Sequence, residues 1–358
     1  MLLFKKKYNY YLYIFFLILV FFFNEFSTNT VLSKNYIVSD IKVEESYNIN
    51  FDKSKVIDKA FNEAFKILTY KLVDNKERSK MKNISLKDKK SLIENFSIIE
   101  EKFINNKYIG QFNVQFNKKK IINYLNNKSI IPSSPNEIKI FLLPILIDTN
   151  LNEPYYLNQN IFYNNWNLNS KNYHLIKYVL PNEDIEDYYI IKNNIKNIEN
   201  YNFKEITKKY NLHNEIIMII LKSNSGLRVF SKIKFGNINL ISNSFYSLDS
   251  FEDEEKINNI IYDIKDNFED RWKSVNKINQ SIVLPIRLSV ISSKTKFSDQ
   301  LENYLSSIDL VSDFKIEIIN NKEIIYKITF NGTPNKFLDI MSLYNIEIDT
   351  SKDIWKIQ

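Results

Sequence analysis

Few residues in this chain could do chemistry, and none of them falls into a catalytic motif. Only His174 and His213 are present, and neither has an acidic or histidine partner at metal-ligand spacing. The absence of cysteine excludes thiol nucleophiles, thiolate metal sites and redox pairs. Four glycines are too few for the glycine-rich loops that cradle phosphates or dinucleotides. We therefore predict no catalytic residue, no metal site and no cofactor.

Paired carboxylates are the remaining route to an enzyme, because a glycosidase needs only two of them. The densest acidic loop before the helix near residue 255 runs from Pro181 to Asp187 and contains Asp184 and Asp187. Its alternative interpretation is the start of a helix, with Asp184 as the N-cap and Asp187 in the first turn. We favour the helix start, since acidic first turns are common. The loop does not have the spacing of a calcium-binding EF-hand.

Aromatic residues offer a second kind of candidate site, because an exposed aromatic cleft can bind a glycan or a peptide. Trp272 lies on an apolar helical stripe and Trp355 in the last predicted strand, so both are expected in the core. Trp166 is less clearly assigned. The candidate ligand-binding residues are therefore Trp166, Asp184 and Asp187.

The first 33 residues have the pattern of a secretory signal. Three lysines, Lys5 to Lys7, precede an apolar run over residues 8–23. A cut between Ser33 and Lys34 would release a periplasmic protein. The alternative is an uncleaved anchor that holds the protein at the inner membrane, facing the periplasm. A lipid-anchored cysteine is excluded, so membrane contact is expected only through this segment.

The net charge of the chain is small for its length. The sequence has 49 Lys and Arg against 42 Asp and Glu, a formal net charge of +7, and no later block of five like charges. Nucleic-acid binding normally requires a clustered basic face. We therefore expect no nucleic-acid partner.

The order of predicted elements indicates an α+β protein made of several small mixed modules. An N-terminal α+β module is expected over residues 34–130, with a helix over 54–72 opened by Asp52 or Ser54 and a hairpin over 96–116. Its turn is placed at Asn105-Asn106. A linker, Pro132-Ser133-Ser134-Pro135, follows.

Two further modules are predicted after the linker. The continuous apolar runs 138–147 and 216–221 indicate a covered sheet in a central α/β module, residues 137–278, which ends in an amphipathic helix. The C-terminal module, residues 281–358, has the βαββαβ order of a ferredoxin-like sandwich. Its first strand contains Pro285, which suggests an edge position or a bulge.

Several short motifs recur in the order of a known family. They are Tyr36-x-Val38, the Ala60 to Leu72 helix, the hairpin ending at Phe116, Leu143-Pro144-Ile145, Trp166, the Pro181 to Asp187 loop, Gly332-Thr333-Pro334 and Trp355-x-Ile357. In this order and spacing the chain resembles the bacterial envelope family called domain of unknown function 2066, over nearly its whole length after the signal. Asn182 stands where the family pattern would have glycine. The resemblance implies an exported envelope protein and no particular activity.

These observations favour a non-enzymatic envelope protein that acts as a binding or assembly module. Its partner is expected to be another envelope protein, taken up as an added strand at an exposed sheet edge. The alternative is a periplasmic hydrolase that acts on a cell-envelope substrate with Asp184 and Asp187 as its carboxylates.

Overall fold

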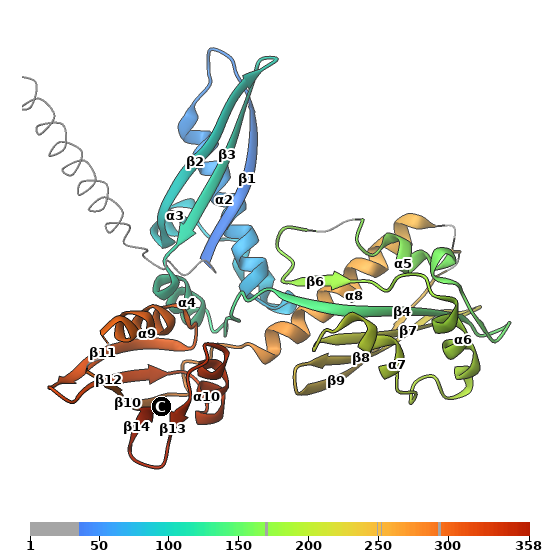
Figure 1. The fold of residues 1–358 in the computed structure, drawn as a ribbon. Helices are drawn as coiled ribbons and strands as arrows, with labels where there is room; N and C mark the ends of the chain where they lie inside the picture. The colour runs from blue at the N-terminus through green and yellow to red at the C-terminus, as the bar shows by residue number, and fades with distance from the viewer. Residues whose placement is uncertain (1–35, 169–170, 249, 252, 293–294) are drawn as a thin grey trace, which may run out of the picture. The chain divides into compact units, whose positions relative to one another are not determined.

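The computed structural model describes residues 36–168, 171–248, 250–251, 253–292 and 295–358 (Figure 1). The expected signal or anchor, residues 1–33, lies outside this range. The α+β class is confirmed: 37% of the chain is helix and 35% is strand, in three separate sheets. Within the described residues, no helix combines the length and apolarity that a bilayer crossing requires.

The chain divides into two compact units. One unit contains the described chain up to Leu284 together with Asn331–Pro334, and the other contains Pro285–Phe330 and Asn335–Gln358. The first unit holds two of the three sheets, and the second unit holds the third.

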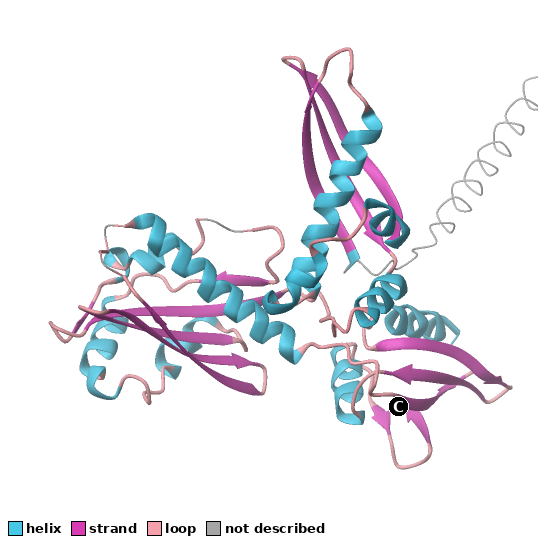
Figure 2. Cartoon of the chain, turned by 180° about the vertical axis from the view of Figure 1, so that it is seen from behind, coloured by secondary structure: helices cyan, strands magenta, loops and turns pink. Residues whose placement is uncertain are grey.

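The first sheet has three antiparallel strands in the order β1-β3-β2, and α2 packs along one of its faces (Figure 2). Of the two predicted N-caps, Asp52 is confirmed, because its side chain accepts a hydrogen bond from the amide of Ser54, which lies inside the helix. The predicted turn is also confirmed, since Asn105 and Asn106 both have positive φ, the backbone of a tight hairpin turn. The elements are β1 (Ile37–Ser46), α2 (Lys53–Leu72), η2 (Asn75–Met81), α3 (Leu86–Leu92), β2 (Ile93–Ile104), β3 (Lys107–Phe116) and α4 (Lys118–Asn127).

The segment between α2 and the hairpin is itself structured. It folds into η2 and the short helix α3, which Ser85 caps by accepting the amide of Asp88. The expected linker is also well packed. Ser133 is fully buried and its amide donates to the carbonyl of Leu72, at the end of α2.

The second sheet has the order β5-β4-β7-β8-β9, and β6 also pairs with β4. Alternate side chains of β4 and β7 face two different cores, one against α8 and one against α6 and the segment around α7. The two apolar runs are therefore strands covered on both faces, as predicted. The elements are β4 (Ile138–Asp148), β5 (Glu153–Pro154), η3 (Leu157–Gln159), α5 (Ile161–Asn165), β6 (Ile176–Val179), α6 (Ile185–Asn193), η4 (Ile195–Asn197), α7 (Lys204–Thr207), η5 (Lys208–Tyr210), β7 (Glu215–Ser223), β8 (Gly226–Phe235), β9 (Ile238–Tyr246) and α8 (Glu254–Val275).

The third sheet, in the second unit, has the order β11-β12-β10-β14-β13. The βαββαβ order is present, and the chain ends in a hairpin whose second strand, β14, pairs parallel with β10. Pro285 was expected at an edge or a bulge, but β10 is the central strand. Proline is tolerated there because it is the second residue of β10, and pairing with β14 begins only at Arg287. The elements are β10 (Leu284–Ile291), α9 (Thr295–Ser307), β11 (Val311–Ile319), β12 (Glu323–Phe330), α10 (Pro334–Leu343), β13 (Ile348–Asp349) and β14 (Ile354–Ile357).

Candidate functional site

One edge of β4 has a gap in its strand pairing beside Pro144. On one side β4 pairs continuously with β7, but on the other side β6 pairs only with residues 138–141 and β5 only with residues 147–148. The amides of Phe141 and Thr149 donate toward the β7 side, so strand alternation places the nitrogen of Pro144 on the opposite edge. Proline has no N–H to donate, so the backbone nitrogen at this position does not need a hydrogen-bond acceptor from a neighbouring strand. The side chain of Asn160 instead donates to the carbonyl of Pro144 at 3.0 Å.

A cavity of about 200 Å³ lies beside this gap, between β4 and α6. Its apolar walls include Leu143 and Ile145 of β4 and Ile191 of α6. Tyr156 and Tyr188 also line it, and their rings stack with centroids 3.9 Å apart at an interplanar angle of 12°. The cavity is therefore largely apolar and aromatic, as ligand pockets commonly are.

The acidic loop forms the polar end of the same cavity. Glu183, Asp184 and Asp187 all line it. Asp184 is the N-cap of α6, and its Oδ1 accepts the amide of Glu186 at 2.8 Å. The prediction of a capped helix with Asp187 in its first turn is confirmed.

A single lysine holds two of these carboxylates. The Nζ of Lys209 donates to Asp184 Oδ2 at 2.6 Å and to Asp187 Oδ1 at 2.7 Å. The hydrogen bond from Lys209, with that from the Glu186 amide, lowers the pKa of Asp184, and the two hydrogen bonds to Asp184 and Asp187 raise the pKa of Lys209. Asp187 is only 4% exposed, and its second oxygen, Oδ2, has no hydrogen-bond partner among the described residues.

This arrangement does not favour the hydrolase alternative. A glycosidase needs one carboxyl group with a raised pKa, which then gives its proton to the leaving group. Asp184 has its pKa lowered instead, and both carboxylates are engaged by the same ammonium group. The contacts give Asp184 a capping role and Asp187 a role in the ion pair.

Trp166 lies elsewhere, in the core between the central sheet and α8. Its exposed fraction is 0%, and its ring contacts those of Tyr178 and Phe268. The Nζ of Lys265 donates to the Trp166 carbonyl and lies 5.3 Å from the ring centroid. The structure therefore assigns Trp166 to the core and separates it from Asp184 and Asp187, because a fully buried ring has no surface open to a dissolved ligand.

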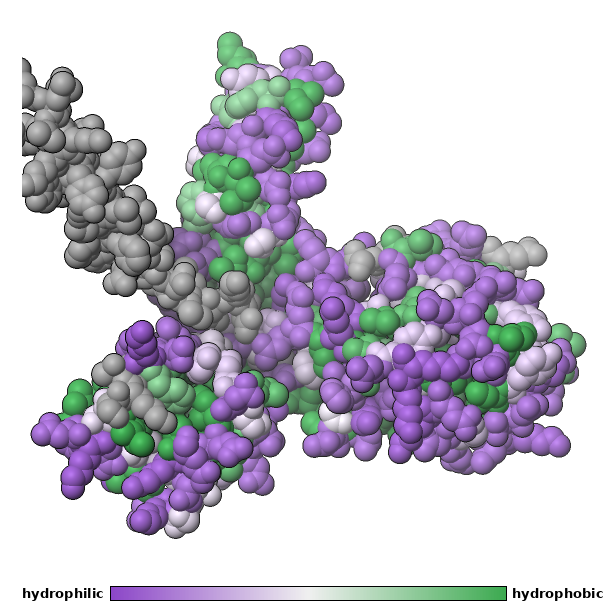
Figure 3. Space-filling view, in the orientation of Figure 1, coloured by the Kyte–Doolittle hydropathy of each residue, from purple (hydrophilic) through white to green (hydrophobic). Residues whose placement is uncertain are grey.

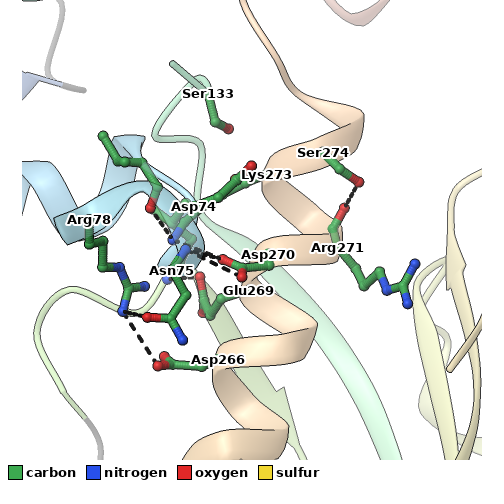
Figure 4. Close-up of polar contacts among 12 residues, drawn as sticks. Asp74, Asn75, Arg78, Ser133, Asp266, Glu269, Asp270, Arg271, Lys273 and Ser274 are labelled. Atoms are coloured by element: carbon green, nitrogen blue, oxygen red, sulfur yellow. Dashed lines mark hydrogen bonds and ion pairs between the residues drawn. The ribbon is translucent and has the colours of Figure 1, made fainter. Parts of the chain in front are cut away.

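A buried polar stripe on α8 was not found from the sequence (Figure 4). Glu269 is 2% exposed, and its two oxygens accept the amides of Leu175 and Ile176 at 3.1 and 2.9 Å. The buried Nζ of Lys273 donates to the carbonyl of Val73 at 3.2 Å. These charged groups satisfy backbone groups that would otherwise be buried without partners.

The same stripe also binds η2 from the first sheet's module. Asp270 accepts the amide of Asn75 at 3.0 Å, and Arg78 approaches Asp266 at 3.4 Å (Figure 4). One sequence signal was available, since residues 266, 269, 270 and 273 recur at helical spacing beside the apolar stripe. Their partners could not be predicted, because they lie between 93 and 200 residues away in the chain.

Burial also shifts the titration of groups near this stripe. It lowers the pKa of His174 to about 4, with the nearby positive charge of Lys265 adding to the effect. It lowers the pKa of Lys265 to about 8, against the opposing influence of Glu269. Within the described part of the chain, no three His, Asp or Glu side chains gather as a metal site.

The strand β2 presents a different kind of surface. It is an edge strand, and no described strand pairs with its outer side. Large apolar residues along it and at the neighbouring loop are exposed, and hydrophobic groups are visible at the free end of this hairpin in Figure 3. They are Phe96, Ile99, Phe103 and Ile104 of β2 with Tyr47 and Ile49 of the loop after β1.

Comparison with known proteins adds no identity to these observations. No family model matches the chain, and no curated protein does. The resemblance to the envelope family therefore stays a prediction from the order of its motifs.

Proposed function

We propose that this protein is an exported, non-enzymatic envelope protein that binds a partner protein along the edge strand β2. The observation that carries the proposal is the combination of an unpaired strand edge and exposed apolar side chains on one element. Ile99 is 56% exposed, and Ile49 at the neighbouring loop is 100% exposed. Soluble proteins generally protect such edges, because free backbone groups beside apolar side chains pair with other strands.

The expected occupant is an extended segment of an envelope protein that adds to the sheet as a fourth strand. Main-chain hydrogen bonds to the outer side of β2 would supply affinity, and alternate side chains would supply specificity. The strand carries Glu94, Glu100 and Glu101 against a single lysine, Lys102, although the whole chain is basic. Lys53 and Lys102 offset part of this charge by pairing with Glu101 and Glu100, and the remaining acidic and apolar character fits a partner strand in which apolar and basic residues alternate.

Export is the second part of the proposal. It is supported by the lysines and the apolar run of residues 1–33, which have the charge and length pattern of a signal. Release into the periplasm would follow cleavage after Ser33, whereas an uncleaved segment would keep the protein at the inner membrane.

The test joins cell fractionation to site-specific crosslinking. N-terminal sequencing of the protein in an envelope fraction should find Lys34 as the first residue if the signal is cleaved, or Met1 if it is not. Full-length protein in the cytoplasm would contradict export.

A photo-crosslinking residue at Ile99 should give one discrete adduct with an envelope protein, and Glu100→Lys should lower the yield of that adduct. The control is Leu343, which is also apolar and is 81% exposed, against 56% for Ile99, but lies in the other unit. Equal adducts from both positions, or an adduct with a second copy of this chain, would overturn the proposed partner.

A further inference from the structure

We infer that the cavity between β4 and α6 binds a small primary amine with an apolar body. This site belongs to the central sheet and is independent of the strand edge proposed above. It is distinguished by three features of the described chain: an aromatic wall, an excess of negative charge, and a buried carboxylate oxygen that lacks a partner.

The wall of the cavity suits an apolar or aromatic group. Leu143, Ile145 and Ile191 form one side of it, and the stacked rings of Tyr156 and Tyr188 form another. Rings of this kind also attract an ammonium group through their negative faces. The volume of about 200 Å³ is below that of a site for a drug-sized molecule, so the ligand must be compact.

The charge at the polar end selects a cation. Glu183, Asp184 and Asp187 line the cavity, whereas no described lysine, arginine or histidine does. Lys209, just outside the lining, neutralises only part of this charge through its bonds to Asp184 and Asp187. An anionic ligand would be repelled by the remaining carboxylate charge, and a neutral ligand would gain less from it than a cation.

The unused acceptor of Asp187 favours a primary amine. Both oxygens of Asp184 already accept hydrogen bonds, from the Glu186 amide and from Lys209. Asp187 uses only Oδ1, and its Oδ2 is buried with no partner in the described part of the chain. Leaving a buried carboxylate oxygen unsatisfied is costly, and a protonated amine supplies N–H donors that a quaternary ammonium lacks.

The experiment is a calorimetric titration of the full-length protein with three probes. Phenethylamine carries the expected ammonium group, 2-phenylethanol has a similar shape without charge, and tetramethylammonium has charge without N–H. We expect phenethylamine to bind in saturable fashion and the other two to bind about tenfold more weakly or less. Binding of the alcohol as tightly as the amine, or no saturable binding of the amine, would overturn the inference.

Matched variants locate the site. Asp187→Asn should weaken amine binding by about tenfold, because it removes the charge and the free acceptor. Glu186→Gln, at an exposed carboxylate in the same first turn but outside the cavity lining, should change it by no more than about threefold. Leu157→Trp, which fills the lining from the short helix η3, should abolish binding even if Asp187→Asn fails to fold. Unchanged affinity in Leu157→Trp would place the amine elsewhere.

Discussion

The stripe on α8 and the edge strand β2 reverse the usual distribution of residue types. Glu269, Lys273 and Lys265 are charged and buried on α8, whereas Ile99 and Phe103 are apolar and exposed on β2. The charged groups of α8 are inside because backbone amides and carbonyls of other segments need partners there. The apolar groups of β2 are outside because no described element covers that edge. Whether a side chain is buried therefore depends on the hydrogen-bond partners and covering elements around it, and not on its residue type alone.

The largest expected effect is the loss of Glu269. Glu269→Ala should lower the free energy of unfolding by about 3–5 kcal/mol. It leaves two buried amides without a hydrogen-bond acceptor and removes negative charge beside buried lysines. Chemical denaturation followed by circular dichroism measures the change. The control is Glu255→Ala, at an exposed position in the first turn of the same helix, where the loss should stay below about 1 kcal/mol. Equal losses in both variants would show that the stripe on α8 is not a structural requirement.

Acidification tests the same buried region through His174. Its pKa is lowered from 6.5 to about 4 in the folded protein, so the unfolded chain binds more protons between these two values. Stability should therefore rise with pH over this window, and acidification from pH 6.5 to 4 should cost up to about 3 kcal/mol through this group.

Denaturation at several pH values, compared between the native chain and His174→Gln, isolates this contribution. The two proteins should differ in slope between pH 4 and 6.5 and run parallel above that range. Identical slopes throughout would mean that His174 is not protected from protonation in the folded state.

The smallest expected effect is at the exposed edge. Ile99→Lys should change the free energy of unfolding by no more than about 0.5 kcal/mol, because the side chain already faces solvent. Phe112→Ala, on the neighbouring strand β3 but fully buried, should cost about 3–5 kcal/mol in the same assay. A large loss in Ile99→Lys would show that this residue is part of the core, and the comparison between β2 and α8 would no longer hold.

Local signals were enough to predict much of the fold. Asp52 and Asp184 were recognised as helix caps because a cap depends only on the next few residues. Asn105-Asn106 identified the hairpin turn for the same reason, since positive φ favours asparagine. The helix η2 and the place of Pro285 in a central strand were not predicted, because their stability depends on contacts with distant segments.

Only part of the candidate site was predicted from the sequence. The acidic residues Asp184 and Asp187 were identified, but their shared partner Lys209 follows more than twenty residues later. Trp166 was grouped with them as a ligand candidate, and the structure places it in a different core. Nothing in the local pattern of Pro144 indicated a cavity, because the gap beside it exists only once β5 and β6 have paired with β4.

The sequence by itself determined the α+β class, the apolar stripes, the caps and the turns, because each depends on short-range periodicity and backbone preference. Only the tertiary structure decided which charges are buried, which apolar groups remain exposed and where a cavity forms. Asp270 and Asn75 illustrate the reason: their hydrogen bond joins residues 195 positions apart, and no local pattern encodes such a distance.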